Sequence, residues 1–445
     1  MGAPGPAGGL LADKGPLQHR VPSRPGSSTM RPQQAAVMED RVKKRRGPHA
    51  WPLLLVAALF FPPVHAAPSF DEAVRAALRV HPRARVHVAL RQVGEGYRRQ
   101  ADALFGGDPA AGLAYRSDDA GGNRGYREWE ANLDLPLWLP GQRGARRSLG
   151  DSIVSRSAAE FRLLAWEVAG EVLERAWSLR LAESNLEQDR SQWDSAKALE
   201  KDVARRVRAG ELARSDLVLA QQETLARETA HQHAMAAVER ERSSWRAYTT
   251  FDELPYDLMV KRTPGAEPSP SHPRLLVMKL AVEQARARRN DVRLKRRENP
   301  VLTLYAKRDR GIGGEPYDNS LGLGISVPFG THASAAPRIA EAELALTRAK
   351  ADWAQAQWAL KLEVEQARQE VARVTRSLEL AEQSSRLARA RIRLTRRAFE
   401  LGETDLYLLL LAREQSAVAA RELEYHRLER MRAIARLNHI RGEDL

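Results

Sequence analysis

The sequence of 445 residues contains no cysteine. This absence excludes disulfide bonds, cysteine-ligated metal sites, a thiol nucleophile and lipid attachment through an N-terminal cysteine. Aromatic residues are also few, at 6%, whereas charged residues reach 29%. Such a composition is more typical of long exposed helices than of a large globular core.

Long apolar runs are scarce as well. The longest, residues 51–61, is shorter than the roughly 20 residues that a membrane-spanning helix needs. It follows the basic residues 43–46 and precedes residues 64–66 (Val-His-Ala), which have the pattern of a cleavage site. These features predict a secretory signal peptide at residues 38–66 and a mature chain that starts at Ala67.

The residues before this signal are rich in proline and glycine and do not fit in front of a signal peptide. We interpret residues 1–37 as a non-native or wrongly assigned extension, with Met38 as the true start. The formal net charge of +14 falls to +8 once residues 1–66 are set aside. The basic stretch at residues 286–297 predicts a solvated helix face without nucleic-acid binding, because no aromatic stacking platform accompanies it.

Proline is absent from two long stretches, residues 148–209 and 338–399. Each predicts a helix of roughly 60 residues, about 90 Å long at 1.5 Å per residue. Apolar residues in the second stretch recur in alternating steps of four and three, which predicts a coiled-coil seam. The seam comprises Leu360, Val364, Ala367, Val371, Val374, Leu378 and Ala381.

The chain also repeats itself at an offset of about 192 residues. His81-Pro82 returns as His272-Pro273, and further pairs keep nearly the same offset. These pairs are Pro109 with Pro300, Tyr115 with Tyr305, Trp166 with Trp358, and Gly210-Glu211 with Gly402-Glu403. A period this long indicates a duplicated unit the size of a domain.

The duplication predicts the domain organisation. Residues 67–262 form the first repeat and residues 274–445 the second, joined by a proline-rich linker at residues 263–273. Each repeat is expected to contain a helix, a β-hairpin, a very long helix, a tight turn and a further helix.

Two segments alternate between apolar and polar or small residues, residues 129–137 and residues 321–329. Period two predicts strands with one apolar face. Their expected partners are residues 112–116 and 302–307, across glycine-containing loops, so four strands in two hairpins are expected. These hairpins fit either two small sheets on a soluble protein or strands embedded in a membrane.

Membrane strands would make oligomerisation necessary, because four strands leave two edges whose backbone groups are unsatisfied in hydrocarbon. Two copies would close a barrel of eight strands and three a barrel of twelve, and the residues alone do not choose. Leu133 and Leu323 are expected on the lipid face. Asn132 and Gly322 are expected on the inner face, where a change to arginine should be milder.

No catalytic or cofactor site is evident, so we expect no enzyme, no cofactor and no bound metal. His231 and His233 are two residues apart on a helix and face different sides, which argues against a shared metal. The glycine-rich residues 311–314 lack a following Lys-Ser/Thr and a helix, so they predict a loop tip rather than a phosphate site.

Three segments together resemble a known family, the TolC-type outer-membrane efflux proteins. They are residues 70–82, from Phe-Asp-Glu-Ala-Val to His-Pro; residues 135–143, from Leu-Pro-Leu to Gly-Gln-Arg; and residues 399–406 (Phe-Glu-Leu-Gly-Glu-Thr-Asp-Leu). The resemblance covers residues 69–442. The run at residues 141–147 is similar to the branch that serves heavy-metal export.

The resemblance implies an α+β membrane protein that works as a homotrimer. Four transmembrane β-strands per chain would complete a 12-stranded β-barrel in the outer membrane of a Gram-negative cell, in contact with its lipid. Long coiled-coil helices would form an α-helical barrel through the periplasm. The partners implied are a periplasmic adaptor protein and an inner-membrane pump of the RND type, and the channel would export metal ions or small toxic compounds.

Gly210 and Gly402 each predict a left-handed turn at the end of one of the two long helices. In the family these turns form the periplasmic tip, so the resemblance assigns adaptor contact to Gly210, Glu211, Gly402 and Glu403. It also implies an acidic residue near the pore constriction, for which Asp405 is the first candidate. Asp216 is the weaker candidate, because the repeat offset aligns it with Leu408.

The leading alternative is a periplasmic adaptor of an efflux pump, which would also be secreted and rich in coiled coil. A duplication with membrane-type strands in both halves argues against it.

Overall fold

The computed structural model describes residues 67–258, 271–329 and 332–442. The expected extension and signal peptide, and all but the end of the expected linker, lie outside these ranges. The first half contains α1 (Phe70–Val80), the 3-10 helix η1 (Pro82–Arg85), α2 (Val86–Asp102), β1 (Ala110–Ser117), β2 (Arg127–Pro136), α3 (Gln142–Arg208) and α4 (Arg214–Thr249). The second contains α5 (Pro273–Leu294), β3 (Val301–Arg310), β4 (Asp318–Ser326), the 3-10 helix η2 (His332–Ala335), α6 (Ala336–Glu400) and α7 (Leu406–Arg441).

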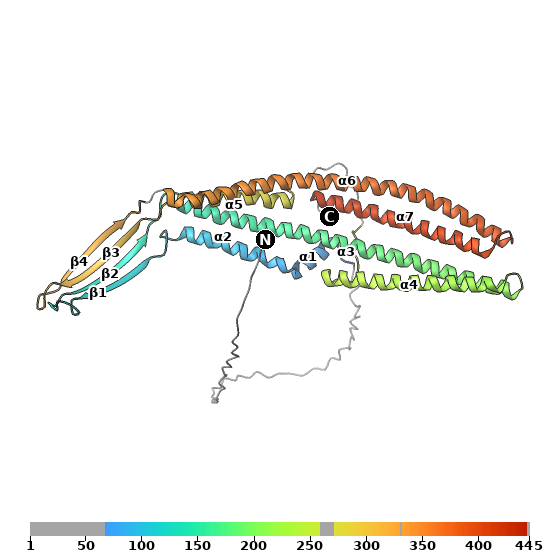
Figure 1. Cartoon of the computed structure of the whole chain (residues 1–445), viewed down its shortest axis with the longest axis horizontal. Helices are drawn as coiled ribbons and strands as arrows, with labels where there is room; N and C mark the ends of the chain where they lie inside the picture. Colours follow the sequence, from blue (N-terminus) through green and yellow to red (C-terminus); the bar gives the residue numbers. More distant parts are fainter. Residues whose placement is uncertain (1–66, 259–270, 330–331, 443–445) are drawn as a thin grey trace, which may run out of the picture. The chain divides into compact units, whose positions relative to one another are not determined.

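Both halves follow the expected order of helix, hairpin, long helix, turn and helix (Figure 1). The two repeated His-Pro pairs begin helices in the same way. Nδ1 of His81 accepts a hydrogen bond from the backbone N–H of Arg83, and Nδ1 of His272 accepts one from Arg274 at 3.2 Å. In each case proline occupies the first turn, where its missing N–H has no cost. The repeated dipeptide is therefore a duplicated N-cap.

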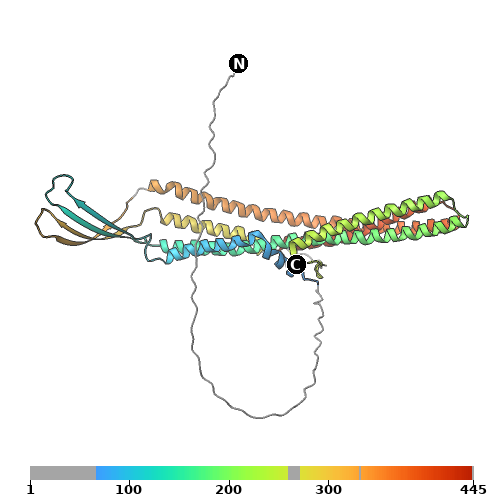
Figure 2. The ribbon, with the colours of Figure 1, turned by 90° about the horizontal axis from the view of Figure 1, so that it is seen from below.

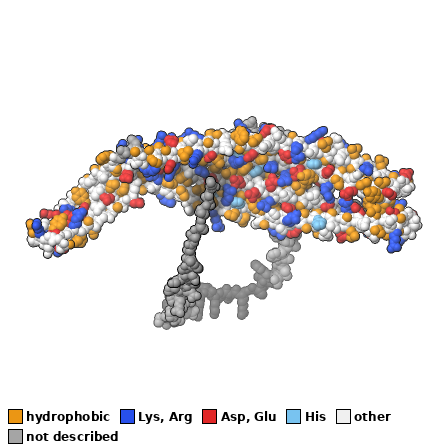
Figure 3. Space-filling view, viewed as in Figure 1, with side chains coloured by type: hydrophobic (Ala, Val, Ile, Leu, Met, Phe, Trp, Pro, Cys, Tyr) orange, Lys and Arg blue, Asp and Glu red, His pale blue; other side chains and the backbone are white. Residues whose placement is uncertain are grey.

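The two proline-free stretches are single helices, as predicted. α3 has 67 residues and α6 has 65, so each is about 100 Å long. Near the sheet the helices lie side by side in the order α2, α3, α5, α6, and beyond it in the order α4, α3, α7, α6 (Figure 1, Figure 2). Charged side chains of both signs are scattered over the helices (Figure 3).

The predicted seam of α6 is confirmed. Leu360, Val364, Val371 and Val374 are buried and pack with residues of α7, with Ala367 partly buried beside them. A second apolar cluster surrounds Trp177 of α3 and Trp245 of α4, both fully buried. None of the helices in the described ranges has an apolar stretch long enough to cross a membrane.

The four strands form one antiparallel sheet in the order β1-β2-β3-β4. The hairpins are joined because β2 pairs with β3 over its whole length, with Leu133 opposite Leu304. Two separate small sheets are therefore not what the chain forms. The register places the leucines of all four strands on one face, with Ala111 opposite Leu133 and Leu304 opposite Leu323.

No part of the described chain covers this apolar face. Leu113 is 73% exposed, Leu321 88% and Leu323 68%. The other face is polar: Thr303 donates to Asp134 at 2.6 Å, and Glu128 forms ion pairs with Arg116 and Lys307.

The expectation that arginine at Gly322 on the polar face is milder than arginine on the apolar face stays a prediction. Gly322 does lie on the polar face, but a Cβ atom at this position would be only 2.0 Å from Cζ of Tyr305. The ring of Tyr305 covers the glycine, so a larger residue cannot be accommodated without moving the ring. Gly324, two residues further along the same face, has no atom within 4 Å of such a Cβ. It is the position where a side chain fits.

Candidate functional site

The turn between α3 and α4 has the left-handed glycine that the sequence predicts. Gly210 has φ of 80°. Its N–H donates to the carbonyl of Val207 at 3.1 Å, and the N–H of Glu211 donates to that of Arg206 at 2.9 Å. These two bonds form a Schellman motif, which satisfies the last carbonyls of the helix.

The turn between α6 and α7 repeats this geometry. Gly402 has φ of 77°, its N–H donates to Phe399 at 3.1 Å, and the N–H of Glu403 donates to Ala398 at 2.9 Å. A Cβ atom at Gly402 or Gly210 would meet no atom within 4 Å. Backbone conformation, and not lack of space, therefore requires glycine at both turns.

The two aperture candidates both cap the helices that follow the turns. Oδ1 of Asp405 accepts from the N–H of Leu408 at 2.8 Å at the start of α7. Oδ2 of Asp216 accepts from the N–H of Ala213 at 3.1 Å at the start of α4. The repeat offset aligns Ala213 with Asp405 and Asp216 with Leu408, so each copy keeps one half of a capping box. A role of these carboxylates at a pore constriction stays a prediction.

The two turns are held together by an apolar cluster that includes Val203, Phe399 and Leu406. Arg206, which the sequence reasoning did not single out, joins both turns. Its Nε lies 3.1 Å from Oε2 of Glu211, and its guanidinium lies 5.1 Å from the centre of the Phe399 ring. The sequence shows Arg206 four residues before Gly210, but it does not indicate that Arg206 contacts Phe399 of the other repeat.

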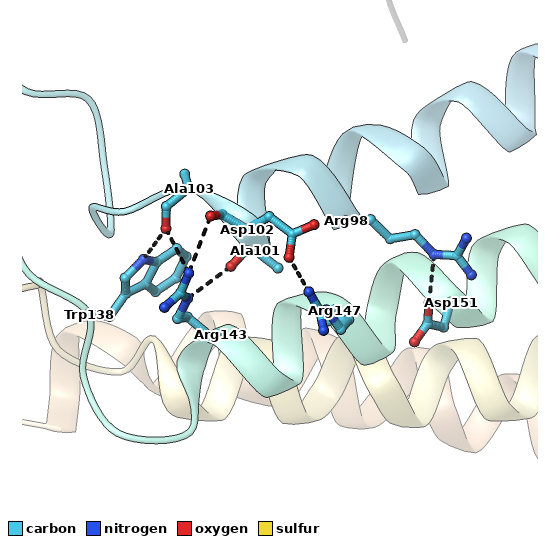
Figure 4. Close-up of polar contacts among 8 residues, drawn as sticks. All are labelled: Arg98, Ala101, Asp102, Ala103, Trp138, Arg143, Arg147 and Asp151. Carbon is cyan, nitrogen blue, oxygen red and sulfur yellow. Dashed lines mark hydrogen bonds and ion pairs between the residues drawn. The ribbon is translucent and has the colours of Figure 1, made fainter.

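At the opposite end of α3, basic side chains bind the end of α2 (Figure 4). The guanidinium of Arg143 donates to the carbonyls of Ala101, Asp102 and Ala103, at 3.0 to 3.3 Å. These are the carbonyls that a helix leaves unsatisfied at its C-terminus, where positive charge is favourable. Nε1 of Trp138 also donates to Ala103, at 3.1 Å, and Arg147 pairs with Asp102.

The same segment binds the end of α5. Nε2 of Gln142 donates to the carbonyl of Leu294 at 3.1 Å, and Nε of Arg146 lies 3.0 Å from Oδ1 of Asp291, with both side chains buried. Arg146 also donates to Gln100 of α2, at 2.9 Å. Gln142, Arg143, Arg146 and Arg147 therefore join both short helices to α3 beside the sheet.

Two buried histidines lie where α5 begins and α7 ends. His439 stacks on Trp166 with 4.5 Å between ring centres, and His272 contacts the same ring edge-on. Burial lowers the pKa of His439 to about 4, helped by the nearby His272, and burial also lowers the pKa of His272. A Cβ atom at Gly170 would be 2.6 Å from Nε2 of His439, so α3 needs glycine there. His439 and Trp166 line a cavity of about 920 Å³ between α3, α6 and α7.

The histidine pair considered for a metal is divided, as expected. His231 is buried and stacks on Trp193, whereas His233 is exposed on another side of α4. Within the described ranges, no group of three or more His, Cys, Asp or Glu side chains is placed to hold a metal ion.

Comparisons with known proteins give a consistent result at the level of structure. No known family profile matches the sequence, and no curated protein matches it. Among solved structures, the outer-membrane protein VceC of Vibrio cholerae superposes with a TM-score of 0.64 at 14% identity, covering 84% of this chain and 96% of that one. The open state of the MtrE outer-membrane channel of Neisseria gonorrhoeae gives 0.66 at 17% identity, over 85% and 90%. The CmeC outer-membrane channel of Campylobacter jejuni gives 0.64 at 14%, over 84% and 85%.

The fold is that of the TolC-type outer-membrane channels. In this TolC-type fold the two glycine turns lie at the end of the helices farthest from the sheet (Figure 1). The run at residues 141–147 lies at the start of α3, at the other end and beside the sheet (Figure 1). The fold expectation is thus confirmed, while the heavy-metal branch is not distinguished from the rest of the TolC-type proteins.

Proposed function

We propose that this chain is one subunit of a passive export duct in the outer membrane of a Gram-negative cell. The observation that carries the proposal is the sheet. Its apolar face is uncovered, its opposite face is polar, and it stands on helices of about 100 Å. Strands of 8 to 10 residues match the 9 to 11 or so that cross a bilayer when tilted.

Closure of the barrel requires further copies of the chain. β1 and β4 are the unpaired edges of the sheet, so β4 of one copy is expected to pair with β1 of the next. The likeness to the TolC-type fold favours three copies and twelve strands over two copies and eight.

The helices support the same arrangement. α6 forms one edge of the helical layer, and α2 with α4 forms the other. Leu380, Leu387 and Leu394 lie seven residues apart on α6 and are 52%, 72% and 73% exposed. Such a row is what a helix of the neighbouring copy would cover.

The proposed partners are a periplasmic adaptor and an inner-membrane pump of the RND type. The tip turns at Gly210, Glu211, Gly402 and Glu403 would meet the adaptor, and metal ions or small toxic compounds would be the cargo. The alternative that the chain is itself an adaptor is not favoured, because an adaptor has no use for a sheet face exposed to lipid.

Reconstitution tests the proposal. The chain should be extracted from outer membranes only with detergent, cross-link as a trimer, and form water-filled pores in planar lipid bilayers. A monomer that stays soluble without detergent would refute the duct.

A further inference from the structure

Near the tip, one segment of α6 is strongly basic. Residues 386–397 contain six arginines and no acidic residue, and all six are exposed. They are Arg386, Arg389, Arg391, Arg393, Arg396 and Arg397. Four of them follow steps of three, four and three, which align them along one side of the helix. These four, Arg386, Arg389, Arg393 and Arg396, are called the arginine row.

Most of this charge has no acidic counterpart in the part of the chain that the structure describes. Arg396 and Arg397 pair with Glu400, and Arg391 binds the side chain of Gln415. Among the residues that the structure describes, Arg386, Arg389 and Arg393 form no ion pair. In the middle of α6, Arg368, Arg373 and Arg376 each pair with a glutamate three positions away. Arg338 and Arg348, near the start of the helix, form no ion pair among the described residues, but they are not clustered with other arginines.

One end of the arginine row borders a groove between the two helical pairs. Arg393 and Arg396 line a cavity of about 320 Å³ that α3, α4, α6 and α7 enclose together. Four of its lining side chains are small, and together they are called the floor: Ser195 and Ala196 from α3, and Ser416 and Ala417 from α7. A floor of this kind lets the backbone of another helix approach closely.

A further arginine lies within the groove. The guanidinium of Arg413 donates to the carbonyl of Ser195 at 3.2 Å. Burial and the nearby charge of Arg396 lower the pKa of Arg413, which means that its positive charge is poorly compensated there. Glu223 also lines the groove but pairs with Arg227. The groove therefore carries an excess of positive charge, which a negatively charged ligand would compensate.

The arginine row is separate from the surface expected to meet a neighbouring copy. At 100° per residue, it lies about 140° around α6 from the leucine row of Leu380, Leu387 and Leu394. Contact between copies through the leucines would leave the arginines exposed.

We propose that this groove binds an acidic α-helix of a periplasmic partner, with carboxylates spaced three and four residues apart along the arginine row. The row spans about 15 Å of α6, which a single small anion cannot bridge. A helix with matching spacing can contact all four guanidinium groups while lying over the small residues of the floor. The inference rests on the proposed function, since it names the chemistry of the partner at the tip.

The test uses the full chain in detergent and a synthetic helical peptide with glutamates at steps of three, four and three. A second peptide carries glutamine at the same positions. We expect the glutamate peptide to bind about tenfold or more tightly than the glutamine peptide at low salt, with the difference shrinking as salt rises. Equal binding of the two peptides would overturn the proposal without recourse to any variant.

A matched pair of variants locates the site. Arg386→Glu with Arg389→Glu and Arg393→Glu should weaken binding of the glutamate peptide by about tenfold or more. The control reverses three exposed basic residues nearer the sheet on the same helix, Arg338, Arg348 and Lys361, and should bind as the unmodified chain does. Equal loss of peptide binding in both variants would show a nonspecific charge effect and would refute the groove as the binding site.

A photo-crosslinking residue at Ser416 in intact cells identifies the natural occupant. Capture of an acidic helical segment of another protein, lost in the triple arginine variant, supports the proposal. Capture of a second copy of this chain or of a phospholipid overturns it. Trimers that conduct in bilayers but bind no glutamate peptide would refute this inference alone, whereas failure to form pores would refute the proposed function.

Discussion

The most direct test of the membrane assignment compares two neighbouring residues of β4 that point to opposite faces. Leu323 lies in the apolar row between Leu321 and Ile325 and is 68% exposed. Gly324 lies on the polar face opposite Thr303, where a Cβ atom meets nothing within 4 Å. Arginine at both positions adds the same side chain and charge to the same strand.

The two changes should differ strongly in cost. β4 has nine residues, so Leu323 is close to the middle of the bilayer, where arginine facing lipid costs about 2 to 4 kcal/mol. Three copies in one barrel raise this to about 6 to 12 kcal/mol per trimer. Gly324→Arg faces water and lies near Asp134, which already accepts a hydrogen bond from Thr303, so its cost should be within about 1 kcal/mol.

The measurements are the amount of trimer in outer membranes and urea unfolding of the trimer in lipid vesicles. We expect Leu323→Arg to remove most of the trimer and Gly324→Arg to leave it nearly unchanged. Equal tolerance of both changes, or greater damage from Gly324→Arg, would refute the assignment of the apolar face to lipid.

Three further predictions concern the tip and the buried histidine. Gly402→Val should cost roughly 1 to 3 kcal/mol because φ at this position is 77°. Trimers should remain intact, while adaptor crosslinking and export should weaken, and Gly210→Val should have the same effect. Normal export in both variants would show that the turns are simple helix caps. Asp405→Ala should alter cation conductance, and Asp405→Ser, which keeps a capping oxygen but removes the charge, separates two causes. A change in conductance in both variants would assign the effect to the charge of Asp405. A change in Asp405→Ala alone would assign it to the helix cap. The pKa of His439 is about 4 in the folded protein and near 6.5 in the unfolded chain. The neutral, buried histidine therefore makes its full contribution to the free energy of unfolding above pH 6.5. As the pH drops from 6.5 towards 4, the free energy of unfolding should fall by about 3 kcal/mol. His439→Gln should flatten this part of a pH series of denaturant titrations, and an unchanged slope would contradict the buried neutral state.

Local patterns predicted much of this fold because the elements are long and regular. The absence of proline located α3 and α6, and the spacing of Leu360 to Ala381 identified the face of α6 that α7 covers. Period two identified the apolar face of the strands. In each case a single periodic feature of one segment decides the structure.

Contacts between distant segments were out of reach. Nothing local indicates that β2 pairs with β3, or that Tyr305 lies over Gly322. The repeat offset aligned Asp216 with Leu408, but only the backbone geometry shows that Asp216 and Asp405 cap their helices from opposite ends of the same motif. Arg143 and Arg146 belong to the run at residues 141–147 that resembles one branch of the family, but their contacts with α2 and α5 depend on tertiary structure.

The unpaired edges at β1 and β4 also have a genetic consequence. If neighbouring copies complete every barrel, a chain with intact edge strands but a defective tip is still incorporated into the oligomeric ring and inactivates it. When half of the chains carry such a defect and mixing is random, only about one ring in eight is built wholly from sound chains. A defect in the edge strands themselves excludes the chain from the ring and leaves the sound copies to assemble alone. Tip mutations should therefore be dominant when co-expressed with the unmodified gene, and edge-strand mutations recessive.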